Sequence, residues 1–188
     1  MLKKENVIFD IEAQFHTLVH FEGVDLAYQK VLIDAGFDVQ AINNQFGESR
    51  SKFDFEQFKN PFAVYERILK AKPGEIFLEP NKISVQTLVD KPIGTDHIIA
   101  IDKLSSHEQQ RLKRFRRSGN LFWKIPGEPV PTHQINAILI PENEKFFLIT
   151  AFPGLYAPPF PDKIKQENRE WHENKRFWDH HAFIEFKK

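Results

Sequence analysis

Two runs of apolar residues, at 135–140 and 146–151, are separated by the polar sequence Pro-Glu-Asn-Glu-Lys. Both runs are rich in Ile, Leu and Phe, which is typical of the two strands of a β-hairpin. A Phe-Pro-Gly sequence and a Pro-Pro-x-Pro sequence follow the second run. Proline cannot donate a hydrogen bond to a strand ladder, so the second strand should end there. The pattern predicts a hairpin at the centre of an antiparallel sheet.

Before residue 93 the pattern is mainly helical. Apolar residues recur at roughly helical spacing over residues 7–37, and Gly36 supplies a stop signal. A shorter helix is predicted over 61–71, with a proline at its start. Two strands are predicted over 75–80 and 82–89. Pro92 and Gly94 form a joint, so residues 1–92 are predicted to be a mostly helical N-terminal subdomain.

After the joint, strands and helices alternate. A strand is predicted over 96–101, and Ser105 with Glu108 forms a capping box for a basic helix over 107–120. A further strand is predicted before the hairpin. After the hairpin, a helix with a stripe of aromatic residues is predicted over 162–181, and a closing strand completes the chain. We therefore predict an α+β fold, with an antiparallel-sheet subdomain over 93–188 that forms one compact unit with the N-terminal part.

Composition narrows the possible chemistry. The 188 residues contain 19 Phe and no Cys, which excludes disulfides, thiol nucleophiles and thiolate metal sites. Lys and Arg together equal Asp and Glu at 26 each, so a polyanion site must come from a local patch of positive charge. His16 and His20 lie four residues apart but have no third metal ligand in their motif. The motifs for nucleotide phosphates and for nucleophile elbows are absent, and we predict no cofactor or metal.

The sequence also gives an expectation for location. The first fifteen residues contain charged residues where a signal peptide would be apolar, and no window is apolar enough to span a membrane. We therefore predict a cytoplasmic protein that has no membrane partner.

One stretch concentrates positive charge. Five of the seven residues from Arg111 to Arg117 are Lys or Arg. Cations near the C-terminal end of a helix complement the helix dipole, which is a purely structural explanation. The same patch is suited to phosphate groups, with Arg114 and Arg117 as substrate-binding residues and RNA as the possible partner. The helix-dipole interpretation and the phosphate-binding interpretation are both kept as alternatives.

A set of polar residues falls at the ends of the predicted strands. Each has a structural explanation, because strand-end threonines often satisfy backbone groups and histidines often pack among aromatic rings. Two imidazoles can also act as general base and general acid, beside a cation that stabilises a developing phosphorane. This is the chemistry of metal-independent RNA cleavage. The predicted catalytic residues are His97, Thr150 and His181, and the further substrate-binding residues are Thr132 and His133.

The second half of the chain resembles a known superfamily. The order helix, strand, basic helix and a hairpin ending in Thr150-Ala151-Phe152-Pro153 resembles the barnase, colicin and toxin-type ribonucleases, over about residues 95–188. The resemblance implies a core antiparallel sheet, cleavage of RNA, and Thr150 as a site residue. The chain departs from the pattern in its net charge of zero and in its first 90 residues, which have no counterpart.

Two other functions remain open. The proline-rich segment 152–161 is suited to a protein partner, in which case the chain is a non-catalytic interaction protein. A hydrolase or isomerase that holds a small ligand in a pocket lined by Phe and Trp is the third possibility. A ribonuclease needs the predicted site residues around one cleft, whereas an interaction protein would leave them scattered.

Overall fold

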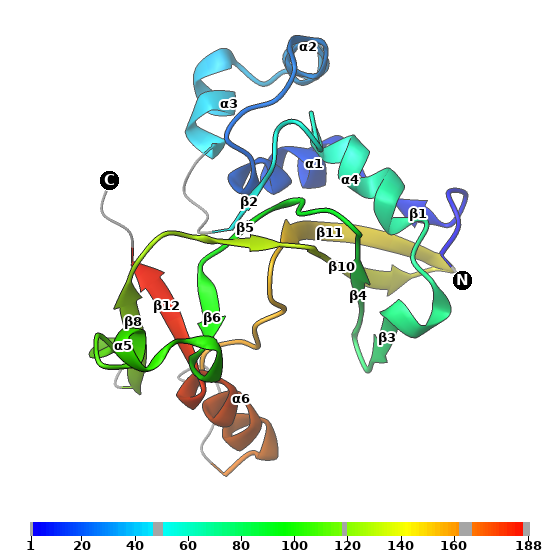
Figure 1. Ribbon diagram of the computed structural model, residues 1–188. Helices are drawn as coiled ribbons and strands as arrows, with labels where there is room; N and C mark the ends of the chain where they lie inside the picture. Colours follow the sequence, from blue (N-terminus) through cyan, green and yellow to red (C-terminus); the bar gives the residue numbers. More distant parts are fainter. Residues whose placement is uncertain (1, 47–50, 118–119, 162–166, 186–188) are drawn as a thin grey trace. The chain divides into compact units, whose positions relative to one another are not determined.

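The computed structural model describes residues 2–46, 51–117, 120–161 and 167–185 of the chain (Figure 1). The chain divides into two compact units, each built from two separate segments. Unit 1 consists of Met1–Thr95 and Pro131–Gly154, and unit 2 consists of Asp96–Val130 and Leu155–Lys188. Helices and largely antiparallel sheets occur together, which confirms the predicted α+β class.

Unit 1 contains a five-stranded sheet with the predicted hairpin at its centre. The strand order is β1-β11-β10-β4-β3, and every pair is antiparallel except β1 with β11. The strands are β1 (Val7–Ile8), β3 (Ile76–Glu79), β4 (Lys82–Leu88), β10 (Gln134–Glu142) and β11 (Lys145–Pro153). Asn143 and Glu144 both have positive φ, which is the geometry of a two-residue hairpin turn. The hairpin prediction is confirmed, with longer strands and a shorter turn.

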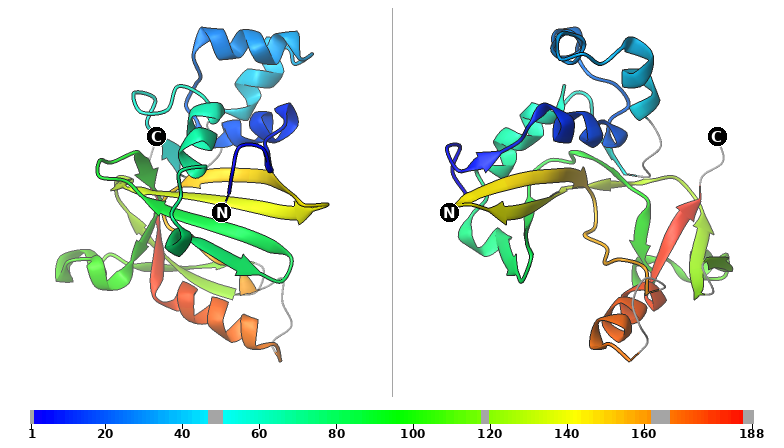
Figure 2. Two further views of the ribbon diagram at one scale, coloured as in Figure 1. Left: turned by 90° about the vertical axis from the view of Figure 1, so that its right-hand side faces the viewer. Right: turned by 180° about the vertical axis from the view of Figure 1, so that it is seen from behind.

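Helices cover one face of this sheet. Side chains that alternate along the central strands form a buried core on that face, for example Val85, Ala137 and Leu148. Figures 1 and 2 show α1 and α4 over this face. The helices of unit 1 are α1 (Ile11–Thr17), α2 (Leu26–Asp34), α3 (Val39–Gln45) and α4 (Pro61–Ile68), with 3-10 turns at η1 (Leu18–His20) and η2 (Pro73–Glu75).

The helix predicted over residues 7–37 is wrong in its length. Val7 and Ile8 form β1, and the remainder is divided into α1, η1 and α2. Each α-helix begins where a short polar side chain caps it, because Asp10 and Asp25 accept hydrogen bonds from backbone N–H groups three residues later. The predicted stop is confirmed, since Gly36 follows α2 with a φ of 101°.

Unit 2 is built on a four-stranded sheet with the order β6-β12-β8-β7. Its strands are β6 (Ile98–Ala100), β7 (Lys113–Arg117), β8 (Asn120–Pro126) and β12 (His181–Glu185). Helix α6 (Arg169–Asp179) packs on one face through Trp178, which joins Phe122 and Phe183 in a buried cluster. The closing strand is confirmed as β12. Residues 162–166 of the predicted C-terminal helix lie outside the described residues.

The predicted basic helix over 107–120 is wrong beyond Gln109, and residues 118–119 of it lie outside the described residues. The capping box is present, but α5 (Ser106–Gln109) ends after one turn and the basic residues form strand β7. The sequence Lys-Arg-Phe-Arg-Arg places one apolar residue at its centre, with two cations on each side. Phe115 lies 5.8 Å from Phe122 and 5.7 Å from Phe183, measured between ring centroids. Packing of this ring against the sheet outweighs the local helical signal.

The division into units differs from the predicted boundary at residue 92. Strand β10 pairs with β4 along six positions, from Gln134 opposite Leu88 to Leu139 opposite Ile83. This pairing places the hairpin in unit 1 with the N-terminal helices. Three further strands are β2 (Lys52–Phe53), β5 (Gly94–Asp96) and β9 (Val130–Thr132). The chain passes from one unit to the other in β5, in β9 and after Gly154.

Candidate functional site

The residues predicted to form one site are divided between the two units. Unit 1 contains Thr132, His133 and Thr150. Unit 2 contains His97, Arg114, Arg117 and His181. A single cleft that contains all seven residues therefore stays a prediction, and the chemistry of each unit is considered by itself.

His97 is buried in unit 2, with 5% of its surface exposed. Its Nδ1 lies 3.3 Å from the carbonyl oxygen of Ile184, and its own carbonyl accepts the N–H of Ile184 at 2.8 Å. A carbonyl oxygen only accepts, so Nδ1 carries the hydrogen in the neutral ring. These contacts attach the chain before β6 to β12. They give His97 a structural role.

His181 lies half-buried at the end of α6. Its ring stacks on Phe177 with centroids 3.9 Å apart, and Nδ1 lies 2.8 Å from the carbonyl oxygen of Phe177. The neighbouring His180 makes the same contact with the carbonyl of Arg176 at 2.8 Å. The last carbonyls of a helix have no partner within the helix, so both imidazoles cap α6.

The three predicted residues of unit 1 do not form one group. Thr132 is buried and its Oγ1 accepts the N–H of Gln134, while the exposed His133 has Nδ1 3.1 Å from the carbonyl of Val89. Thr150 pairs with Ile138 on β10. Ile138 is five residues beyond His133 and six beyond Thr132, so at ~3.3 Å per residue Thr150 is separated from them by about 17 to 20 Å along the strand.

Asp96 is a buried carboxylate that the sequence analysis missed. Its Oδ2 accepts the N–H of Leu155 at 2.6 Å, and its Oδ1 accepts the N–H of Ile98 at 3.1 Å. Burial raises the pKa of Asp96, whereas these N–H groups and the nearby His181 oppose the rise. Asp96 thus joins the two segments of unit 2. An aspartate two residues before an apolar strand is the only local signal for it.

The basic cluster forms an exposed edge strand. Four of the five residues of β7 are cations, and all four are exposed: Lys113, Arg114, Arg116 and Arg117. The guanidinium carbon of Arg114 lies 4.2 Å from the ring centroid of Trp123, and that of Arg117 lies 4.1 Å from Phe160. Within the described part of the chain, no ion pair is found for these four cations. We call residues 113–117 the basic strand.

The net charge of zero conceals opposite charges on the two units. Unit 2 contains 14 Lys and Arg and 10 Asp and Glu, a formal charge of +4. Unit 1 contains 12 Lys and Arg and 16 Asp and Glu, a formal charge of −4. The basic strand therefore belongs to a unit whose overall charge also attracts polyanions.

The proline-rich segment is largely used inside unit 2. Trp178 donates from Nε1 to the carbonyl of Pro158 at 3.2 Å, and Asn174 donates to the carbonyl of Pro159 at 3.1 Å. Phe160 stacks on Trp178 with centroids 4.8 Å apart. These contacts occupy the rings and carbonyls that a protein partner would need. They do not support the segment as a docking site.

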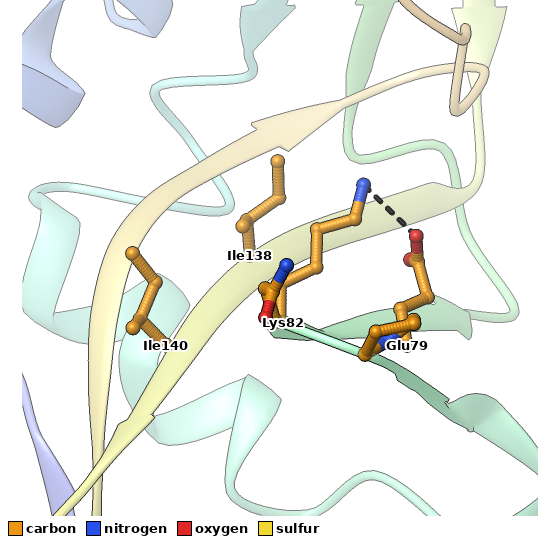
Figure 3. Close-up of a pocket in the computed structure, with 6 residues that line it drawn as sticks. Glu79, Lys82, Ile138 and Ile140 are labelled. Carbon is orange, nitrogen blue, oxygen red and sulfur yellow. Dashed lines mark ion pairs between the residues drawn. The ribbon is translucent and has the colours of Figure 1, made fainter.

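A shallow pocket lies on the helix-free face of the sheet in unit 1 (Figure 3). Its volume is about 340 Å³, and it is lined by Glu79, Pro80, Asn81, Lys82, Ile138 and Ile140. Glu79 and Lys82 form an ion pair at 3.1 Å along its rim. The third prediction required a Phe- and Trp-lined pocket, and this pocket has neither residue in its lining.

Over residues 2–46, 51–117, 120–161 and 167–185, no cluster of three or more His, Asp or Glu is arranged to hold a metal. No helix in these ranges has the length and apolar character needed to cross a membrane. Comparison of the chain with protein families, curated proteins and solved structures found no match to any of them.

Proposed function

We propose that unit 2 binds RNA through the basic strand β7. The observation that carries this proposal is the presence of four exposed cations in five residues, for which the described residues supply no ion-pair partner. Phosphate groups are the counter-charges that such a row of Lys and Arg would take. The formal charge of +4 on the unit adds a longer-range attraction to the local one.

Protection of the sheet edge is an alternative explanation for the basic strand. Edge strands often carry charged residues, especially lysine, that prevent pairing with another chain. Here three of the four cations are arginines, and the guanidinium groups of Arg114 and Arg117 lie over aromatic rings. Such contacts fix the guanidinium for bidentate recognition of phosphate, which protection of an edge does not require.

The dimensions of the basic strand favour RNA over a membrane surface. Five residues at ~3.3 Å per step extend for about 13 Å, and successive side chains point to opposite sides of the sheet. This is a narrow ribbon of charge, suited to a single phosphodiester chain that follows the edge. A membrane surface requires a wide basic face that also inserts apolar side chains.

The proposal is tested by charge reversal in unit 2. We expect Arg116→Glu with Arg117→Glu to weaken binding of a labelled RNA of about ten nucleotides by about tenfold or more, measured by fluorescence anisotropy. Arg169→Glu with Arg176→Glu is the matched control, because it makes the same change of charge at two exposed arginines of α6 in the same unit. Equal losses in the double variant and the control, or binding to anionic vesicles in place of RNA, would overturn the proposal.

Cleavage of the bound RNA by His97 and His181 is the second part of the hypothesis, and it rests on the sequence. One observation favours it: the hydrogen bond from Nδ1 leaves Nε2 of neutral His181 in the basic form. The same samples, incubated with excess chelator and separated on a denaturing gel, test it. Fragments that disappear with His181→Ala but persist with His180→Ala would support cleavage, and intact RNA throughout would reject it.

A further inference from the structure

The hairpin of β7 and β8 has two chemically different faces. Arg114 pairs with Trp123 and Arg116 pairs with Leu121, and directly paired residues share a face of an antiparallel sheet. Phe115 pairs with Phe122 on the opposite face. The alternation of the strand therefore divides the hairpin into one face with two arginines and a second face centred on two phenylalanines.

The arginine face carries the exposed aliphatic side chain of the hairpin. Leu121 is 39% exposed and Trp123 is partly exposed there, whereas on the other face Phe115 is partly exposed and Phe122 is 2% exposed beneath α6. The guanidinium of Arg114 lies over the Trp123 ring at 4.2 Å, and Arg114 is itself exposed. A flat cation supported on an aromatic ring thus lies beside an exposed aliphatic side chain and a second arginine.

We propose that this face binds an unpaired nucleotide, with its base on the guanidinium plane of Arg114 and the Leu121 side chain. Arg116 holds the adjoining phosphate. The inference rests on the proposed RNA binding and specifies its substrate class as single-stranded RNA. It adds contact with the bases to the phosphate contacts of the basic strand.

The chemistry of the face supports this choice. A base stacks on aromatic rings and on arginine planes, and every base offers such a surface. In a duplex the flat surfaces of the bases are covered by their neighbours, so a duplex can offer this face only phosphates and sugars. Lysine carries the same charge as arginine but has no plane on which a base can stack.

The experiment compares three ligands of equal length: a single-stranded RNA, an abasic strand with the same phosphates, and an RNA duplex. Because one stacked base contributes about fivefold or more in affinity, we expect the wild-type protein to prefer the single strand over the abasic strand by at least that ratio. Fluorescence anisotropy at constant salt gives each affinity.

Arg114→Lys isolates the stacking contribution, and Leu121→Ser provides a second exposed variant on the same face. Each should reduce the preference for the single strand over the abasic strand to about one. Arg169→Lys makes the same chemical change at an ion-paired position in α6 and should leave the preference intact. Equal affinity of the wild-type protein for both strands would overturn the inference but keep RNA binding. Binding to neither strand would overturn RNA binding itself.

Discussion

Among the described residues, five histidines direct the same ring nitrogen to a backbone carbonyl oxygen. They are His20, His97, His133, His180 and His181, with Nδ1 between 2.8 and 3.3 Å from the oxygen. Each imidazole thereby contacts the backbone of a residue in its own unit. At the scale of single residues, the histidines act mainly as polar links within each unit, which is the structural explanation that the sequence also allowed.

His20 makes stability depend on pH. Burial lowers the pKa of His20 from 6.5 to about 4, against the hydrogen bond to Ser51. The unfolded chain binds the proton at a higher pH than the folded chain, so the stability linked to His20 is present above pH 6.5 and is lost as the pH falls towards 4. The loss should amount to at most about 3 kcal/mol.

Urea unfolding at a series of pH values measures this loss. His20→Gln removes the titrating group, so the difference in unfolding free energy between variant and wild type should change between pH 7 and pH 4. His172→Gln, at an exposed position of α6, is the control and should follow the wild type. If His20→Gln and the wild type lose stability in parallel, the pKa of His20 is not lowered in the folded protein.

At the scale of elements, the sequence predicted correctly those features that depend on residues close together in the chain. The hairpin, the capping box at Ser105 and Glu108, and the stop at Gly36 all depend on residues within a few positions of one another. The basic strand depends on Phe115 meeting Phe122 and Phe183, and Phe183 is distant in the sequence. No local pattern contains that contact, so charge and capping alone suggested a helix.

Gly94 permits the close approach of β2 and β5. A Cβ atom at this position would lie 2.0 Å from the carbonyl oxygen of Lys52. Gly94→Ala should therefore force the two strands apart and lower the free energy of unfolding by about 1–3 kcal/mol. Thermal unfolding followed by circular dichroism measures the effect. Gly74→Ala is the control, since nothing lies within 4 Å of its Cβ, and a comparable loss there would contradict the explanation.

At the scale of the whole molecule, the two units exchange segments along the chain. Residues 131–154 belong with the N-terminal segment because β10 pairs with β4, which precedes it by about fifty residues. A signal such as Pro92 marks a boundary between consecutive segments of the chain. It does not reveal a unit that is built from two separate segments. The division into units also could not be read from the total charge, because the formal charges of −4 and +4 on the two units cancel.

The measurement that tests RNA binding most directly is its salt dependence. Each phosphate contacted on a single strand contributes about −0.7 to the slope of log affinity against log salt concentration. Phosphate contacts from three or four cations, without or with Arg114, therefore predict a slope of about −2.1 to −2.8. We expect this slope for wild-type protein and single-stranded RNA, and a shallower one for Arg116→Glu with Arg117→Glu. A wild-type slope near zero, or no binding at low salt, would contradict the assignment of the basic strand to RNA.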